Sequence, residues 1–259
     1  MARIIAVSNQ KGGVGKTTTA ISLAAGLAQA GLRTLLADMD PQGNATSGIG
    51  LSKDDVRYSV YHTLVGVCRP SQAIVHTHLA NLDMMPANRE LVGAEVELAN
   101  TPERGMQLRQ SMVPLKRRYD YIIIDCPPSL GVLTLNALVS ADSVLVPLQC
   151  EYFALEGLGE LVRTLQLVKN RLNTKLEREG ILLTMYDRRN RLCIQVADEV
   201  RRLLGDLVFK TVIPRNVRLG ECPSHGQTIF EYDARAAGAK AYQALTNELL
   251  HRHEIGTTS

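Results

Sequence analysis

The chain has 259 residues, 45% of them hydrophobic and 21% charged, and a formal net charge of +3. This composition is typical of a soluble globular protein, and no apolar run approaches the ~18 residues that span a bilayer. The first residues lack the layout of a signal peptide, so we expect a cytoplasmic protein with no membrane attachment. Five scattered cysteines without a C-x-x-C pair argue against a disulfide framework, a zinc site or an iron–sulfur site.

Short apolar segments alternate with amphipathic segments from the N-terminus onward. Strands are expected over residues 3–8, 34–37, 82–86, 121–125, 143–147, 181–185 and 208–213, and helices over residues 16–30, 106–118, 133–140, 154–172, 194–204 and 236–251. Residues 41–58 are rich in Gly, Ser, Asn and Asp and are expected to form a loop. Near-continuous apolar strands between helices predict a mostly parallel twisted sheet with helices on both faces. We therefore expect a single α/β domain over residues 1–259, ending in a short polar tail at 252–259.

The first connection between a strand and a helix carries a phosphate-binding motif. Residues 9–18 read NQKGGVGKTT. In the pattern G-x-x-x-x-G-K-[ST], Gln10 replaces the first glycine and an additional lysine, Lys11, follows it. Lys16 is expected to neutralise the β- and γ-phosphates, and the Thr17 hydroxyl is expected to bind Mg²⁺. The complete set expected around the phosphates is Gly12, Gly13, Val14, Gly15, Lys16, Thr17 and Thr18, which predicts a P-loop NTPase fold.

Three aspartates end buried strands of the predicted sheet. Asp38 and Asp40 close one strand, and Asp125 ends the apolar run YIIID. Ligands of open parallel sheets gather outside the carboxyl ends of the strands. The segment around Asp125 has the layout of a Walker B strand, whose acid holds Mg²⁺. Asp38 and Asp40 lie two residues apart and point the same way from an extended strand. The residues alone leave open which of the two serves the metal and which the attacking water.

These motifs resemble the ParA/MinD family of P-loop ATPases, which carry a deviant Walker A motif. The family pattern K-G-G-x-x-K-[ST] is met by residues 11–17. The resemblance continues at residues 38–46 (DMDPQGNAT), 119–131 (YDYIIIDCPPSLG), 144–158 (VLVPLQCEYFALEGL) and 212–229 (VIPRNVRLGECPSHGQTI), and so runs almost end to end. The segments DPQGN and PRNVRL indicate the chromosome-partitioning ParA (Soj) branch, whose members act with a ParB-type centromere-binding protein.

The resemblance implies a catalytic set of Lys11, Lys16 and Asp40. Lys11 would cross a dimer interface to the partner's nucleotide; the alternative is that it contacts its own phosphates or solvent. Asp40 would act on the hydrolytic water and join Thr17 and Asp125 at the metal. Pro214 and Asn216 match the segment that contacts adenine, and the implied cofactors are ATP and Mg²⁺.

The function implied by the resemblance is DNA segregation. ATP would drive homodimerisation and binding to DNA, and a basic N-terminal peptide of the ParB-type partner would stimulate the hydrolysis that releases the dimer. Whether the cargo is a chromosome origin or a plasmid stays open.

Positive charge is concentrated in residues 163–220, which hold 13 Lys/Arg and 6 Asp/Glu. This excess suggests a surface that faces a polyanion, although solvated helix faces explain it equally well. By the resemblance, Arg189, Arg215 and Arg218 fall where this branch carries basic residues for non-specific binding of double-stranded DNA. No helix-turn-helix or aromatic stacking surface is apparent, so we expect phosphate contacts without sequence readout and a nucleoid-associated protein.

Three other classes of protein were weighed as alternatives. A MinD-like membrane-associated spatial regulator would need an amphipathic C-terminal helix, but residues 251–259 are polar and contain no Phe or Trp. An iron–sulfur carrier would need a suitable cysteine pair. A small-molecule ATP-dependent ligase would need a substrate pocket, and no motif marks one.

Overall fold

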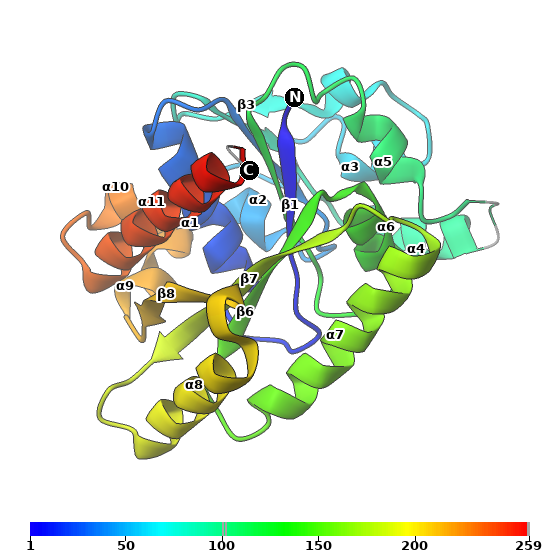
Figure 1. Cartoon of the computed structure of the whole chain (residues 1–259). Helices are drawn as coiled ribbons and strands as arrows, with labels where there is room; N and C mark the ends of the chain where they lie inside the picture. Colours follow the sequence, from blue (N-terminus) through cyan, green and yellow to red (C-terminus); the bar gives the residue numbers. More distant parts are fainter. Residues whose placement is uncertain (100, 102, 258–259) are drawn as a thin grey trace.

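The computed structural model describes residues 1–99, 101 and 103–257, which form an eight-stranded sheet between two layers of helices (Figure 1). The strands run in the order β3-β4-β2-β5-β1-β6-β7-β8, and every neighbouring pair is parallel except β3 and β4. Their bounds are β1 Arg3–Val7, β2 Thr34–Asp38, β3 Val75–His76, β4 Leu82–Met85, β5 Tyr121–Asp125, β6 Ser143–Gln149, β7 Glu177–Tyr186 and β8 Val208–Pro214. The expected α/β architecture is confirmed.

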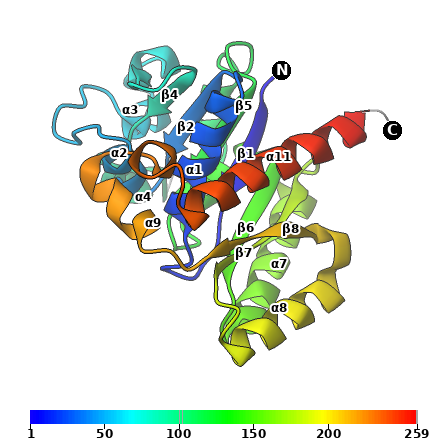
Figure 2. The ribbon, with the colours of Figure 1, turned by 90° about the vertical axis from the view of Figure 1, so that its left-hand side faces the viewer.

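The helices divide between the two faces of the sheet. Ile4 and Ile122 belong to the core that α4 to α8 cover, whereas Ile5 and Ile123 pack in the core that α1 and α11 cover. This division follows because successive strand residues point to opposite faces. Figure 2 shows α1 and α11 side by side across one face. The helices are α1 Lys16–Gln29, α2 Asn44–Gly48, α3 Val60–Leu64, α4 Leu91–Ala99, α5 Gln107–Met112, α6 Val132–Ser140, α7 Ala154–Arg171, α8 Arg191–Leu204, α9 Arg218–Glu221, α10 Ile229–Tyr232 and α11 Ala237–Thr257.

Between β2 and α6 the structure differs from the sequence-based expectation. The segment 41–58, expected as a loop, contains the short helix α2, and α3 and α4 were not expected at all. The helix expected over 106–118 is confined to α5, Gln107–Met112. It ends there because Pro114, two residues further on, has no backbone N–H to donate into another helical turn.

At the C-terminus, α11 continues to Thr257, through most of the segment expected as a polar tail. The Arg252 guanidinium donates to the Val208 carbonyl at 3.1 Å and to Glu248 at 2.8 Å, and it lies over the Phe209 ring. These contacts hold the last turns against the domain; residues 258 and 259 lie outside the described part. None of the helices described is both long and apolar enough to cross a membrane.

Candidate functional site

The phosphate loop leaves β1 at the centre of the sheet, and β1 lies between β5 and β6. The register of the strands sets Val7, at the end of β1, beside Asp125, and Asp125 in turn beside Asp38 at the end of β2. Three strands therefore end at one edge, which is the location of ligand sites in open parallel sheets. The loop then enters α1 at Lys16.

The loop conformation requires glycine at two positions. Gly13 and Gly15 have φ values of +75° and +86°, in the left-handed region that favours glycine. A Cβ at Gly12 or Gly13 would meet no atom within 4 Å, so the outer side of the loop is open. Below it, the buried Lys16 ammonium donates to the Lys11 carbonyl at 3.0 Å. Burial lowers the Lys16 pKa, an effect that Asp125 partly offsets.

Asp125 meets the requirements of a metal ligand. It is fully buried, and within the described part of the chain neither carboxylate oxygen accepts a hydrogen bond of normal geometry. Burial and the neighbouring Asp38 raise its pKa well above the ordinary value, although the nearby Thr17 hydroxyl and the Lys16 ammonium act in the opposite sense. A buried carboxylate without donors is costly, and a hard divalent cation takes oxygen ligands of this kind. Thr17 and Asp125 therefore fit Mg²⁺.

The structure separates the two acids that the residues alone left equivalent. Asp38 is completely buried and accepts from the Thr46 hydroxyl at 2.8 Å, the Thr46 N–H at 2.9 Å and the Asp40 N–H at 3.1 Å. Burial raises its pKa to about 6, against the lowering effect of Thr46. Asp40 accepts one local bond, from the Gln42 N–H at 2.9 Å. Asp38 thus holds the loop after β2, and Asp40 has the spare oxygen capacity to act on a ligand.

Lys11 pairs with a carboxylate outside its own phosphate loop. Its ammonium forms an ion pair with Glu151, which lies between β6 and α7, and its side chain is 42% exposed. The Lys11 N–H donates to the Asn9 side chain at 3.0 Å. The two lysines of the motif therefore differ in partner and burial: Lys16 is buried and binds the loop's own backbone, whereas Lys11 is partly exposed and pairs with Glu151.

The residues expected near adenine line a cavity of about 250 Å³ beside the phosphate loop. Pro214 and Asn216 share this cavity with Gly15 and Thr18, so the structure brings the two distant segments together. The complete lining is Gly15, Thr18, Thr184, Met185, Ile213, Pro214, Arg215, Asn216, Leu219, Gly220 and Tyr242.

Two residues that support this cavity were not expected from the sequence. The Thr184 hydroxyl donates to the Val14 carbonyl at 2.9 Å, and the Tyr242 hydroxyl lies 3.0 Å from the Thr19 hydroxyl. Both contacts join segments far apart in the chain. A polar residue late in an apolar strand, as at Thr184, is the only sequence signal that pointed to either.

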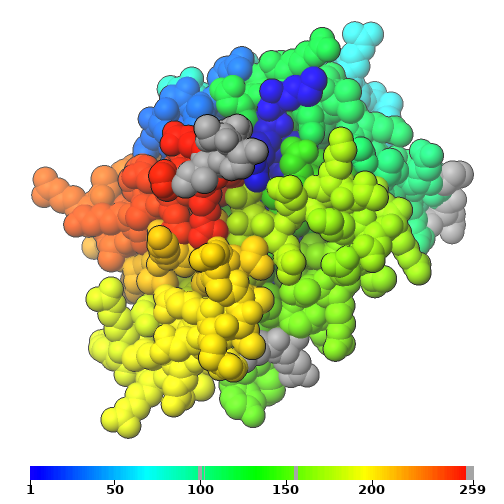
Figure 3. All heavy atoms as spheres, viewed as in Figure 1, coloured from blue at the N-terminus to red at the C-terminus, as the bar shows by residue number. Residues whose placement is uncertain are grey.

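The three arginines expected to bind DNA do not all line the same groove. Arg189 and Arg215 line a groove of about 720 Å³ between the end of β7, β8 and the start of α11. Arg218, on α9, pairs with Glu221 at 2.8 Å and Asp233 at 3.7 Å and is not part of that groove lining. The chain around α8, yellow in Figure 3, lies at the surface of the molecule.

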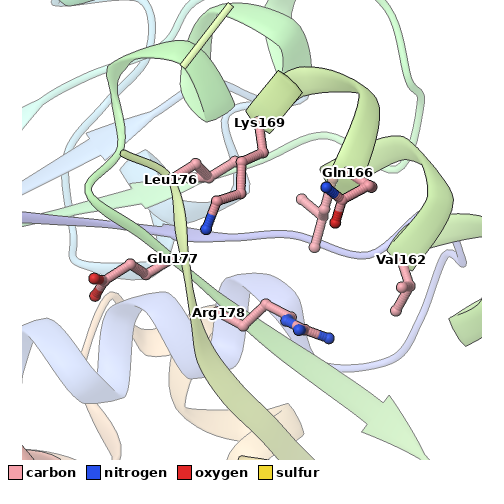
Figure 4. A pocket seen from close by; sticks show the side chains of 7 residues that line it. Val162, Gln166, Lys169, Leu176, Glu177 and Arg178 are labelled. Carbon is pink, nitrogen blue, oxygen red and sulfur yellow. The ribbon is translucent and has the colours of Figure 1, made fainter. Parts of the chain in front are cut away.

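A separate hollow of about 180 Å³ lies between α7 and the start of β7 (Figure 4). Its side chains include Gln166, Lys169 and Arg178. Glu177, also in its lining, is the first residue of β7 and lies opposite Ser143, the first residue of β6, in the register of these parallel strands. This hollow therefore sits at the end of the strands opposite the phosphate loop, and it takes no part in the site.

Comparison with known proteins gives a consistent result. A family model described as "AAA domain" matches residues 2–178. The chain is 57% identical to chromosome partitioning protein ParA of Myxococcus xanthus, over 96% of this chain and 88% of that protein. It is 55% identical to sporulation initiation inhibitor protein Soj of Bacillus subtilis, over 96% and 98% of the two chains.

A solved structure titled cobyrinic acid a,c-diamide synthase from Mycobacterium smegmatis, with bound ADP and magnesium, has a TM-score of 0.87 at 39% identity, covering 99% of this chain and 97% of that one. The septum site-determining protein MinD of Pyrococcus horikoshii, complexed with Mg-ADP, has a TM-score of 0.79 at 25% identity, covering 96% of each chain. The fold, the phosphate loop and these similarities agree: the chain belongs to the ParA/Soj family of chromosome-partitioning P-loop ATPases.

Proposed function

We propose that this chain is a DNA-segregation ATPase in which ATP closes a homodimer, the dimer binds DNA without sequence preference, and hydrolysis releases it. The single observation that carries the proposal is that the two lysines of one phosphate loop have different partners and exposure: Lys16 binds the loop's own backbone, and Lys11 pairs with Glu151 outside it. Lys16 is placed for the nucleotide of its own protomer. Lys11 is partly exposed, so a second copy can receive it once its ammonium has left Glu151.

Electrostatics explain why such a lysine links ATP to dimerisation. Two triphosphates that face each other bring many negative charges together at short range, where Coulomb repulsion is strong. A Lys11 from each protomer offsets that repulsion only in the closed dimer. The dimer is then favoured by ATP, and loss of the γ-phosphate removes the charge that Lys11 compensates.

Hydrolysis requires a metal, a water and a residue that directs the water. Thr17 and Asp125 would hold Mg²⁺, which supplies charge neutralisation at the β- and γ-phosphates when bound. Asp40, with its spare oxygen at the edge of the sheet, would orient the water and contribute to the metal site. Asp38 keeps the Asp40 loop in place through Thr46.

DNA binding would depend on dimerisation, because the basic surface of one protomer binds DNA only weakly. A few arginines on one protomer contribute little, because each phosphate contact competes with salt. Two protomers present twice the number of contacts, so the nucleotide state sets the affinity. The names of the relatives support a partitioning role, and a ParB-type protein with a basic peptide is the proposed stimulator, placing the protein on the nucleoid.

The experiment is an ATPase assay with matched additions: duplex DNA, duplex DNA with a ParB-type protein, anionic lipid vesicles, or small-molecule acids that a ligase would amidate. We expect stimulation by DNA together with the ParB-type protein. Stimulation by vesicles would favour the MinD-like alternative, and stimulation by a small acid would favour a ligase. Either result would overturn the proposal.

A further inference from the structure

The groove beside β8 contains three arginines in different electrostatic states. Arg188, Arg189 and Arg215 all line it. Within the described part of the chain, neither Arg188 nor Arg215 makes an ion pair or a side-chain hydrogen bond. Arg189 is different, because a carboxylate from the same loop, Asp187, already occupies its guanidinium.

The Asp187–Arg189 pair uses both oxygens of the carboxylate. Oδ1 accepts from the Arg189 Nε at 3.1 Å, and Oδ2 accepts from a terminal guanidinium nitrogen at 3.1 Å. Oδ1 also accepts from the Arg189 N–H at 2.9 Å, and the Asn190 N–H donates to the Asp187 carbonyl at 3.1 Å. The pair is therefore built into the turn that follows β7.

The position of Asp187 resembles that of a bound phosphate. A carboxylate and a phosphate offer the same pair of oxygens to the fork of a guanidinium group. The Arg189 side chain is 90% exposed, so DNA can reach it, but a DNA phosphate must replace Asp187 to form both bonds. Arg215 is also close enough to contribute to the lowered pKa of Asp187, behind the larger effect of Arg189.

We propose that Asp187 is an internal counter-ion that competes with DNA phosphates for Arg189 and lowers the DNA affinity of this groove. This inference rests on the DNA-binding function proposed above. An exposed pair of this kind is weak, so it reduces the affinity of one protomer without blocking the surface. A lone protomer therefore binds DNA more weakly than its arginines alone would allow, and Arg188 and Arg215 carry the first contacts.

The test compares Asp187→Asn with a matched variant, Asp120→Asn. Asp120 forms the same arrangement with Arg33: two guanidinium bonds of 3.2 and 2.8 Å, and one from the Arg33 N–H at 2.9 Å. It lies directly before β5, at the opposite edge of the sheet. Both substitutions remove one negative charge and keep an oxygen that can accept the N–H bond.

Binding of the ATP-loaded protein to a random-sequence duplex is measured by fluorescence anisotropy at ~100 mM salt. We expect Asp187→Asn to tighten binding about threefold per protomer, or about tenfold for a two-protomer complex, from the size of exposed pairs. Asp120→Asn should change it less than twofold, because charges further apart than a Debye length are screened. Equal effects of the two variants would overturn the inference.

A double-mutant cycle tests whether Asp187 acts through Arg189. In an Arg189→Ala background, Asp187→Asn should no longer tighten binding; a gain that persists there would contradict the proposal.

A second measurement does not depend on the fold of the Asp187 variant. Arg215→Ala should weaken DNA binding more than Arg189→Ala does, and the reverse order would also overturn the inference. If the wild-type protein shows no ATP-dependent DNA binding, the proposed function itself fails; if it binds normally and Asp187→Asn has no effect, only this inference fails.

Discussion

Lys11 and Glu151 form an ion pair that joins the phosphate loop to the start of α7 within one protomer. The pair ties up the same ammonium group that the dimer is proposed to need. Lys11 can therefore reach a second nucleotide only after it has left Glu151, so the contact opposes dimerisation.

Replacing Glu151 with Gln should make dimerisation easier. Both side chains are about one-third or more exposed, and exposed pairs contribute about 0–1 kcal/mol each. A homodimer breaks two such pairs, so the dimerisation constant should shift by at most about thirtyfold. Sedimentation velocity across a range of ATP concentrations should show the dimer at lower ATP than in the wild type. A dimer that is unchanged or weaker would mean that Glu151 does not compete for Lys11.

Removing the Asp40 carboxylate should separate nucleotide binding from hydrolysis. Asp40→Ala keeps Lys16, Thr17 and Asp125, so the variant should still bind ATP and dimerise. Its turnover should fall by about a hundredfold or more, which is the usual contribution of a general base that acts on the attacking water. Phosphate release measured beside the ATP-dependent dimer checks both parts. Wild-type turnover would remove Asp40 from the reaction.

Asp125 should destabilise the protein when the site is empty and stabilise it when metal is bound. The pKa of Asp125 is higher in the folded protein than in the unfolded chain. The buried carboxylate therefore lowers the free energy of unfolding once the pH rises above the pKa that Asp125 has in the unfolded chain. Asp125→Asn should therefore melt at the same or a higher temperature without ligand at neutral pH, yet lose the stabilisation that Mg²⁺ adds to ATP. Thermal scans with ATP, with and without Mg²⁺, measure this difference. If Mg²⁺ stabilises the ATP-bound variant as much as it stabilises the wild type, Asp125 is not a metal ligand.

The C-terminal helix is held by a pH-sensitive contact at the other end of the sheet. Burial would raise the pKa of Glu179, but His253, 2.8 Å away, lowers it below its ordinary value with the help of Ser143 and Arg3. The resulting stability is present above the unfolded pKa of about 4.3 and is lost as pH falls through the lower folded value. Glu179→Gln should thus destabilise the protein at pH 7 and matter less at pH 3.5. Urea unfolding at both values checks this; an equal loss at both would contradict it.

Site residues could be predicted from the sequence where they lie next to a strand or helix that the apolar pattern marks. The phosphate loop lies between a strand and a helix that the apolar periodicity marks, and Asp125 ends a run of buried residues, so both could be placed without coordinates. The basic excess over residues 163–220 is also visible in the sequence alone, because counting charges needs no fold; its role in DNA binding stays a prediction.

The remaining contacts depend on tertiary structure. The bond between Thr184 and Val14 joins β7 to the phosphate loop across most of the chain, and no spacing rule predicts it. The residues alone did not distinguish Asp38 from Asp40; the resemblance assigned the water to Asp40, and only the structure shows that Asp38 is held by Thr46. Asp187 looked like one more acid in a basic segment until the structure showed both of its oxygens on Arg189.

We propose above all that Lys11 acts between protomers while Lys16 acts within one. The most direct measurement is analytical ultracentrifugation of Lys11→Ala in the presence of ATP and Mg²⁺, together with a calorimetric measurement of ATP affinity. Lys16→Ala, which should lose ATP binding itself, is the control. We expect Lys11→Ala to bind ATP with nearly wild-type affinity and to stay monomeric; a wild-type ATP-dependent dimer in that variant would show that Lys11 does not act between protomers.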